Sequence, residues 1–358
     1  MATIKTFSEF SMSYTVNTML LQLENDLLQL EPGQECHGAL KIHCTRPEHV
    51  EKIFIQFIGV AKTEWKLGET YLVGNSAIVD KVPYTSERHY SGDEVVLPSK
   101  TLTSGMNILP FNMTVPVEVP PSFENNLGCI RYWIKASVQR GSGNSTIAIP
   151  IEISTNPVVK CSDFLTKPIR KESRRDLGKL FFKNGHVRAA IGVQKATFSV
   201  GESMEVNVEV DNESEKKITD IQFQLVQLSH FSAQRDCTRP SLKRNHKEVE
   251  FKQDEFVVKE WCDVVKIEKH ERATYQDVLR VPEVIPSFNN CQIVQVNYVL
   301  RTKIVTKTNK TLLCCDIPVQ IRGVSSEYSA NTSPRSSLSV EINAYQHPVN
   351  APQPILTF

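Results

Sequence analysis

A stretch from the middle of the chain returns near its end, and this repetition limits the folds that the chain can adopt. Residues 119–138 read VPPSFENNLGCIRYWIKASV, and residues 284–304 read VIPSFNNCQIVQVNYVLRTKI. Each segment opens with a proline turn and the triplet Pro-Ser-Phe, then runs into alternating apolar and polar residues. If a whole domain is duplicated, further matches should follow in the same order at a nearly constant spacing.

Five pairs of residues meet this expectation. Their separations are 168, 166, 166, 165 and 166 residues. In chain order the pairs are Gly33 with Gly201, Ile55 with Ile221, Pro116 with Pro282, Pro121 with Pro286, and Tyr132 with Tyr298. The order and the small drift in spacing predict two homologous domains in tandem.

The repeated unit has the pattern of β-strands. Residues 130–138 place Ile, Tyr, Ile, Ala and Val at every second position, which puts them on one face of an extended strand. Gly33 and Gly201 precede strands and suit turns that need a positive φ. The repeated prolines cannot continue a ladder and mark connections, while Phe123 and Phe288 after them are expected in the core. We predict an all-β protein of two antiparallel, immunoglobulin-like sandwiches.

The spacing of the repeat also predicts the domain boundaries. We place the first sandwich at residues 8–156 and the second at residues 185–324. Residues 157–184 form a basic interdomain connector, with a short helical turn near residues 173–182 as its only candidate helix. Residues 325–358 contain serines and prolines at low hydrophobicity, which favours a disordered tail.

Composition excludes several classes of function. The 41 basic and 40 acidic side chains give a net charge of +1, so no overall field favours nucleic acid. The nine cysteines form no Cys-x-x-Cys pair, which favours free thiols over a zinc site or disulfides. The first twenty residues lack the apolar core of a signal peptide. We expect a protein that lies in the cytoplasm or peripheral to a membrane, with no metal or cofactor.

Enzymatic activity is not expected either. The chain has no Gly-x-Ser-x-Gly, no phosphate-binding glycine loop before a helix, and no His-Glu-x-x-His motif. The segment RGSGNST at residues 140–146 indicates a turn between strands. The pattern therefore favours a binding protein.

Several of these segments resemble the arrestin family. The similar segments are LEPGQECHGALKI, FIGVAKTEW, ILPFNMTVPVEVPPSFENNLGCIRYWIKASVQR, FSVGESMEVNVEVDN and LRVPEVIPSFNNCQIVQVNYVL. The resemblance covers roughly residues 8–322 and implies an arrestin-type N-terminal and C-terminal sandwich. Residues 92–111 contain no amphipathic helix, which makes the chain most similar to the arrestin domain-containing proteins, or α-arrestins.

The resemblance implies a cytoplasmic or endosomal adaptor. Such proteins bind cytoplasmic tails of receptors or transporters, act as signalling scaffolds in endocytosis and protein transport, and in many cases recruit a HECT ubiquitin ligase through Pro-Pro-x-Tyr motifs. The tail of this chain has no Pro-Pro-x-Tyr, so we do not expect ligase recruitment by that route. The alternative is a coat-like subunit of a sorting complex, similar to the arrestin-fold component of retromer.

Three kinds of binding surface remain as hypotheses. A basic strip in the connector suits phosphoinositide headgroups or a phosphorylated tail, although such charges also suit a solvated linker. Serines of the tail are candidate phosphorylation sites, and an extended cargo peptide could pair with an exposed strand edge. The strip comprises Lys160, Lys167, Arg170, Lys171, Arg174, Arg175 and Lys179; the serines are Ser333, Ser336 and Ser337.

Overall fold

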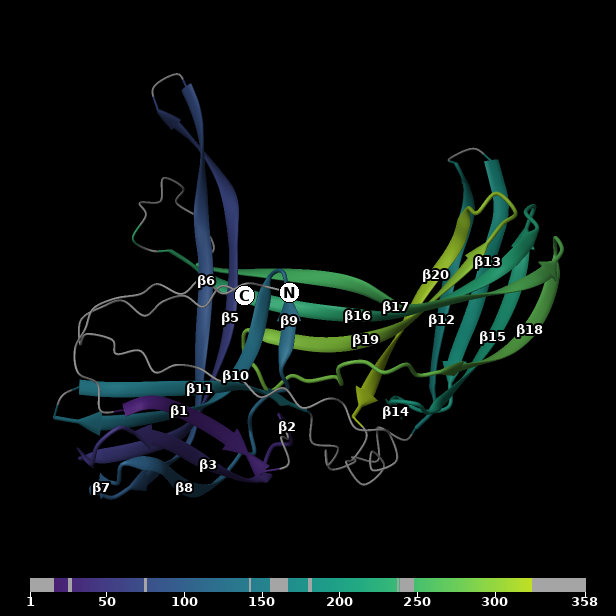
Figure 1. The fold of residues 1–358 in the computed structure, drawn as a ribbon. Coiled ribbons are helices and arrows are strands. Elements are labelled where there is room, and N and C mark those ends of the chain that lie inside the picture. The colour runs from purple at the N-terminus through teal and green to yellow at the C-terminus, as the bar shows by residue number, and fades with distance from the viewer. Residues whose placement is uncertain are drawn as a thin grey trace.

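A computed structural model describes residues 16–24, 28–73, 76–141, 143–154, 167–179, 182–236, 238 and 248–323. Over these residues the regular structure is β-sheet, arranged as two sandwich-like halves (Figure 1). The predicted fold class is therefore confirmed.

The first half packs a small sheet against a larger one. The small sheet has the order β1-β3-β8, and the larger one runs β6-β5-β10-β11-β2. Buried side chains alternate along the strands, as in β10, where every second residue from Ile130 to Arg140 is buried. The bounds are β1 Val16–Leu23, β2 Gln29–Leu30, β3 Glu35–Cys44, β5 Lys52–Val73, β6 Ser76–Leu97, β8 Gly105–Thr114, β10 Gly128–Arg140 and β11 Gly143–Ile153. Short strands complete this half: β4 Glu48–Val50, β7 Lys100–Leu102 and β9 Phe123–Asn125.

The second half repeats this arrangement. Its larger sheet has the order β17-β16-β19-β20-β14, matching β6-β5-β10-β11-β2, and in both halves the last short strand pairs in parallel with its neighbour. The opposing sheet is β12-β13-β15-β18. The bounds are β12 Ile169–Lys179, β13 Phe182–Val193, β14 Thr197–Ser199, β15 Ser203–Ser214, β16 Ile218–Arg235, β17 Val249–Ile267, β18 Glu271–Arg280, β19 Val294–Val305 and β20 Thr311–Arg322.

Ile55 and Ile221 lie on equivalent strands of the two halves. Ile55 on β5 lies opposite Ala136 of β10, and Ile221 on β16 lies opposite Ile304 of β19. Both isoleucines are fully buried. The repeat seen in the sequence is thus a repeat of strands and core. The register of pairing differs by two residues, since Tyr132 lies opposite Gly59 whereas Tyr298 lies opposite Gln227.

Residues 169–179 differ from the sequence prediction. The sequence predicts a connector here, with a helical turn near residues 173–182, but residues 169–179 form strand β12, which pairs with β13. Charged residues on both faces hide the two-residue period of this strand. Lys171 and Arg175, on the face of β12 that is turned toward β20, donate hydrogen bonds to main-chain carbonyls of β20. These bonds satisfy the two charged side chains on that face of the strand.

The two halves share one continuous sheet. Arg235 and Gln234 at the end of β16 pair with Tyr84 and Thr85 of β6, joining the two larger sheets. The β5–β6 hairpin continues past this junction and projects from the body of the molecule (Figure 1).

Candidate functional site

The two Pro-Ser-Phe turns are built alike. The Tyr132 hydroxyl donates to the carbonyl of Pro120 at 2.7 Å, and the Tyr298 hydroxyl donates to the carbonyl of Ile285 at 2.5 Å. Each carbonyl belongs to the residue just before the Pro-Ser-Phe triplet. Both tyrosines are buried and both have raised pKa values, with burial as the main cause. The tyrosine therefore holds its turn against the strand that follows.

The serine of each triplet anchors the turn to a neighbouring strand. Ser122 exchanges hydrogen bonds with the main chain of Ile153, its N–H donating at 2.8 Å and its hydroxyl accepting at 2.9 Å. Ser287 makes the same pair of bonds with Ile321, at 2.8 and 3.0 Å. Each turn is thus held at two points, which fixes the direction of the phenylalanine that follows.

The glycine turns are also equivalent. Gly33 has φ 83° and its N–H donates to Val115, while Gly201 has φ 81° and its N–H donates to Val281, both at 2.9 Å. Pro116 and Pro282 follow those acceptors directly. The left-handed backbone explains why glycine stands at both positions.

The phenylalanines of the two turns meet between the halves. The ring centroids of Phe123 and Phe288 are 6.0 Å apart in an edge-on arrangement, and Phe231 of β16 lies 6.1 Å from Phe123. All three rings are buried. Their contact makes the hydrophobic core continuous across the boundary, so the repeated triplet also forms the joint.

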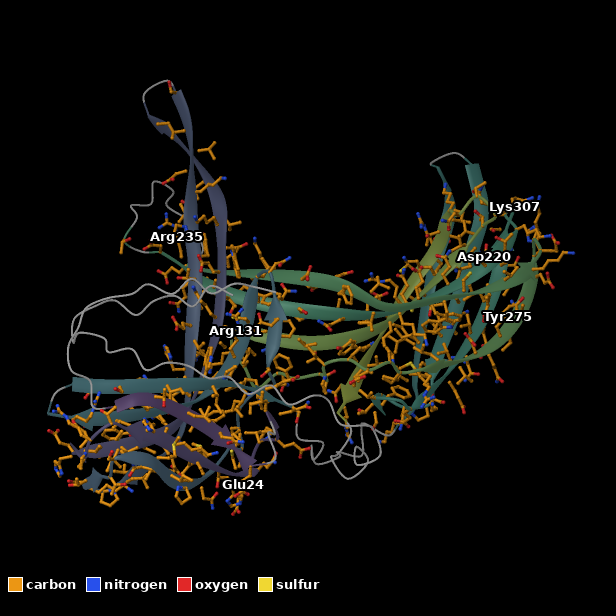
Figure 2. All side chains as sticks on the ribbon, viewed as in Figure 1. Glu24, Arg131, Asp220, Arg235, Tyr275 and Lys307 are labelled. Atoms are coloured by element: carbon orange, nitrogen blue, oxygen red, sulfur yellow. The ribbon has the colours of Figure 1, made fainter. Side chains whose placement is uncertain are left out.

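A buried ion pair ties the hairpin to the second half. Arg235 Nε and Nη2 donate to the two carboxylate oxygens of Glu69 at 3.0 Å each, from β16 to β5. The Arg235 side chain is 6 % exposed and that of Glu69 20 %. The Tyr84 hydroxyl also donates to Glu69, at 3.4 Å. In Figure 2, Arg235 lies beside the β5–β6 hairpin.

Two cavities flank this joint. A cavity of about 730 Å³ is lined by Phe123, Tyr132 and Trp133 from the first half and reaches Ile285 of the second. Another, of about 760 Å³, lies among β6, β16 and the start of β17 and has more polar walls, including Arg88. The serine hydroxyls in their walls bond to main-chain groups: Ser122 accepts from Ile153, Ser86 accepts from Gln234, and Ser232 donates to Gln292.

The predicted basic strip is largely paired. Arg170 forms a two-point ion pair with Glu209, at 2.6 and 2.8 Å, and Arg174 bonds Asp176. Lys171 and Arg175 donate to carbonyls of β20. Lys167 is exposed, and Lys179 is the last residue of β12. Lys160 lies outside the described residues. The strip remains a prediction, with four cations already bound by neighbours.

The tail sites cannot be placed in the structure. Ser333, Ser336 and Ser337 lie outside the described residues. Phosphorylation of these serines remains a prediction.

Three of the described thiols, Cys36, Cys129 and Cys315, do not suit nucleophilic chemistry. Burial raises the pKa of Cys36 to about 11 and is also the main cause of the raised pKa of Cys129 and Cys315. Such thiols stay protonated near neutral pH. Within the described ranges no group of three His, Cys, Asp or Glu side chains is placed to hold a metal ion, and no helix is long and apolar enough to cross a membrane.

Sequence reasoning missed the contacts between the halves. Glu69 and Arg235 are 166 residues apart and belong to no motif, and nothing in the pattern indicated that Phe123 and Phe288 would meet. One signal was present: the duplication itself placed two like turns at equivalent ends of two sandwiches.

Comparison with known proteins agrees with this architecture. The family described as "Arrestin (or S-antigen), N-terminal domain" matches residues 21–154, and "Arrestin (or S-antigen), C-terminal domain" matches residues 183–327. Arrestin domain-containing protein 17 of Caenorhabditis elegans is 26% identical over 288 residues, which cover 74% of this chain and 62% of that protein.

Two further relatives bear similar names. Arrestin domain-containing protein 15 of Caenorhabditis elegans is 22% identical over 283 residues, covering 75% of this chain and 71% of the relative. Arrestin domain-containing protein 1 of Homo sapiens is 21% identical over 218 residues, covering 60% of this chain and 48% of the relative. The chain thus matches less than two thirds of the first and third of these relatives. With both arrestin domains present in order, the chain belongs to the arrestin family and is similar to its α-arrestin members.

Proposed function

We propose that this protein is a non-enzymatic adaptor that binds cytoplasmic segments of membrane cargo and supports protein transport, including endocytosis. Arrestin family proteins are generally non-enzymatic adaptors that bind membrane receptors or cargo. The observation that carries the proposal is the joint between the halves. A shared sheet, three packed rings and a buried ion pair join the two sandwiches, and a joint of this kind can hold two binding surfaces at a set distance.

The proposed location is the cytoplasm, peripheral to the plasma membrane or endosomes. Free thiols in the described residues suit a reducing compartment. A link to ubiquitination is also proposed, through a paired adaptor or another contact, because the tail lacks Pro-Pro-x-Tyr.

Proximity labelling in intact cells tests the adaptor function. We expect the full chain to label transmembrane receptors or transporters above a matched control that carries the labelling enzyme alone. A stoichiometric complex with other coat proteins, without membrane cargo, would contradict the adaptor and favour a coat subunit. A second sample lacking residues 325–358 shows whether the tail selects the partners.

A further inference from the structure

Strand β17 has a long edge that no other strand covers. Residues 249–267 pair with β16 on one side, and within the described part of the chain no strand pairs with the other side. Near its end the edge approaches β18, because Trp261 Nε1 donates to Asp277 there. Residues 249–259 therefore present main-chain N–H and C=O groups that a further strand can use.

Large apolar side chains stand in solvent along this same edge. Phe251 is 73% exposed, Phe256 62% and Val257 41%. Phe251 lies opposite Ser232 and Val257 opposite Val226, so these two share one face of the sheet, and Phe256 lies on the other face. Edge strands of monomeric proteins are usually protected by charges or prolines. On β17 charged residues are also present, but two exposed phenyl rings stand among them and provide anchors on both faces for an added strand.

An apolar row leads from the edge into the sheet. Val257 lies opposite Val226 of β16, which lies opposite Val299 of β19, and Val299 lies opposite Pro318 of β20. Val226 and Val299 are buried. If a further strand is added beside β17, its apolar side chain opposite Val257 would become the next member of this row.

The strand is acidic. Strand β17, residues 249–267, carries five carboxylates and three lysines, and one carboxylate, that of Glu255, is paired with Arg301 at 2.9 Å. Lys252 is turned toward the first half, with its Nζ 5.2 Å from the ring centroid of Trp65. The carboxylates of β17 are Glu250, Asp254, Glu255, Glu260 and Asp263. This charge attracts a basic partner and repels an acidic one.

We propose that residues 249–259 bind an extended, basic segment of a partner protein by strand addition. Main-chain hydrogen bonds would provide the affinity, while apolar side chains at alternate positions would pack on Phe251 and Val257. The source of the segment rests on the proposed function: cytoplasmic segments beside membrane spans are rich in Lys and Arg. The edge lies between the β5–β6 hairpin and the far end of the second half, and is open along its upper side in Figure 1.

A synthetic peptide tests the site on the full chain. The probe is a fluorescent peptide of about ten residues that alternates lysine with valine or threonine, a typical strand length. We expect saturable binding by anisotropy, slower amide exchange at residues 249–259, and about tenfold weaker binding for Phe251→Lys combined with Val257→Lys. Ile108→Lys is the matched control, since Ile108 is 61% exposed on the distant strand β8. It should leave binding unchanged.

A peptide methylated on every second amide nitrogen isolates the main-chain contribution. It keeps the side chains and the charge but cannot complete the ladder, so we expect no binding at comparable concentrations. Equal binding of the methylated peptide would overturn strand addition. Slow amide exchange at residues 249–259 in the absence of peptide would also overturn it in two cases. One is that the slow exchange is lost when residues 325–358 are removed, and the other is that it increases with protein concentration. Those results would make the tail or a second copy the occupant.

The site and the adaptor function can fail separately. If membrane proteins are labelled equally by the Phe251→Lys, Val257→Lys protein, the function stands and this site is wrong. If the peptide binds the edge as expected but labelling returns no membrane protein, the site stands and the proposed function is wrong.

Discussion

The rings of Phe123 and Phe288 meet edge-on at 6.0 Å, and each is the last residue of a Pro-Ser-Phe triplet. Equivalent residues of a duplicated domain thus form the contact between the two copies. The turns are held in place by Tyr132 and Tyr298, so the joint depends on the same hydrogen bonds that shape each sandwich. Folding of either half therefore prepares one side of the interface.

The two rings should be energetically coupled. Phe123→Leu and Phe288→Leu each remove aromatic contact, and the double variant should cost less than the sum of the singles by about 0.5–1.5 kcal/mol. Urea unfolding of the four proteins measures this cycle. Phe251→Leu is the control, because its ring is 73% exposed and its change should stay within about 0.5 kcal/mol. Simple additivity of the two single variants would contradict the coupling.

Tyr298 should make stability fall at high pH. Burial raises the pKa of Tyr298 in the native state, whereas an unfolded tyrosine ionises near about 10. Below that pH both states are protonated and the stabilisation is complete; as pH rises further the unfolded state loses its proton first, and stability falls. Urea unfolding from about pH 8 to about pH 11 follows this trend.

Tyr298→Phe is the informative variant in that series. It should lose about 1 kcal/mol near neutral pH, because the Ile285 carbonyl loses its donor, yet decline less steeply above about pH 10. An unchanged slope would show that Tyr298 ionises alike in both states.

The Arg235–Glu69 pair should contribute more than a surface ion pair of the same type. Glu69→Gln leaves a buried guanidinium without its carboxylate, and we expect a loss of about 3 kcal/mol. Arg131 and Glu124 form a similar two-point pair whose side chains are 39% and 61% exposed, so Glu124→Gln should cost about 1 kcal/mol or less. Thermal unfolding compares the two. Equal losses would mean that burial does not strengthen the link between the halves.

Gly33 and Gly201 should respond alike to substitution. Gly33→Ala and Gly201→Ala force a Cβ into a left-handed backbone at φ 83° and 81°, at a cost of about 1–2 kcal/mol each. Space does not contribute, since an added Cβ would meet nothing closer than 3.6 Å at Gly33 and nothing within 4 Å at Gly201. Gly141→Ala is the control, with no positive φ and similar space. Chemical denaturation should separate it clearly from the other two.

The basic strip gives a prediction in two directions. Replacing Arg170, Lys171, Arg174 and Arg175 by Ala should weaken sedimentation with vesicles that contain phosphoinositide, by removing cations near the anionic surface. Glu209→Gln should strengthen it, because this change releases Arg170 from its ion pair. Sedimentation that is unaffected by either change would show that β12 acts only as a strand.

Local patterns account for what the sequence predicted. The alternation in β10 and β19, the turn glycines and the prolines of the triplets each report the conformation of a few neighbouring residues, and they predict two β-sandwiches. Strand β12 was missed for the same reason. Its charges lie on both faces, and the carbonyls of β20 that accept from Lys171 and Arg175 are about 140 residues away in the chain.

By itself, the sequence determined that the chain is a duplication and what each copy is made of, because a repeated spacing and a two-residue period are properties of the chain alone. Only the tertiary structure decided that β6 pairs with β16, that Glu69 binds Arg235, and that β17 is left with an open edge. Such features depend on which distant segments come together when the core packs, and a pairing of that kind leaves no periodic trace in the order of the residues.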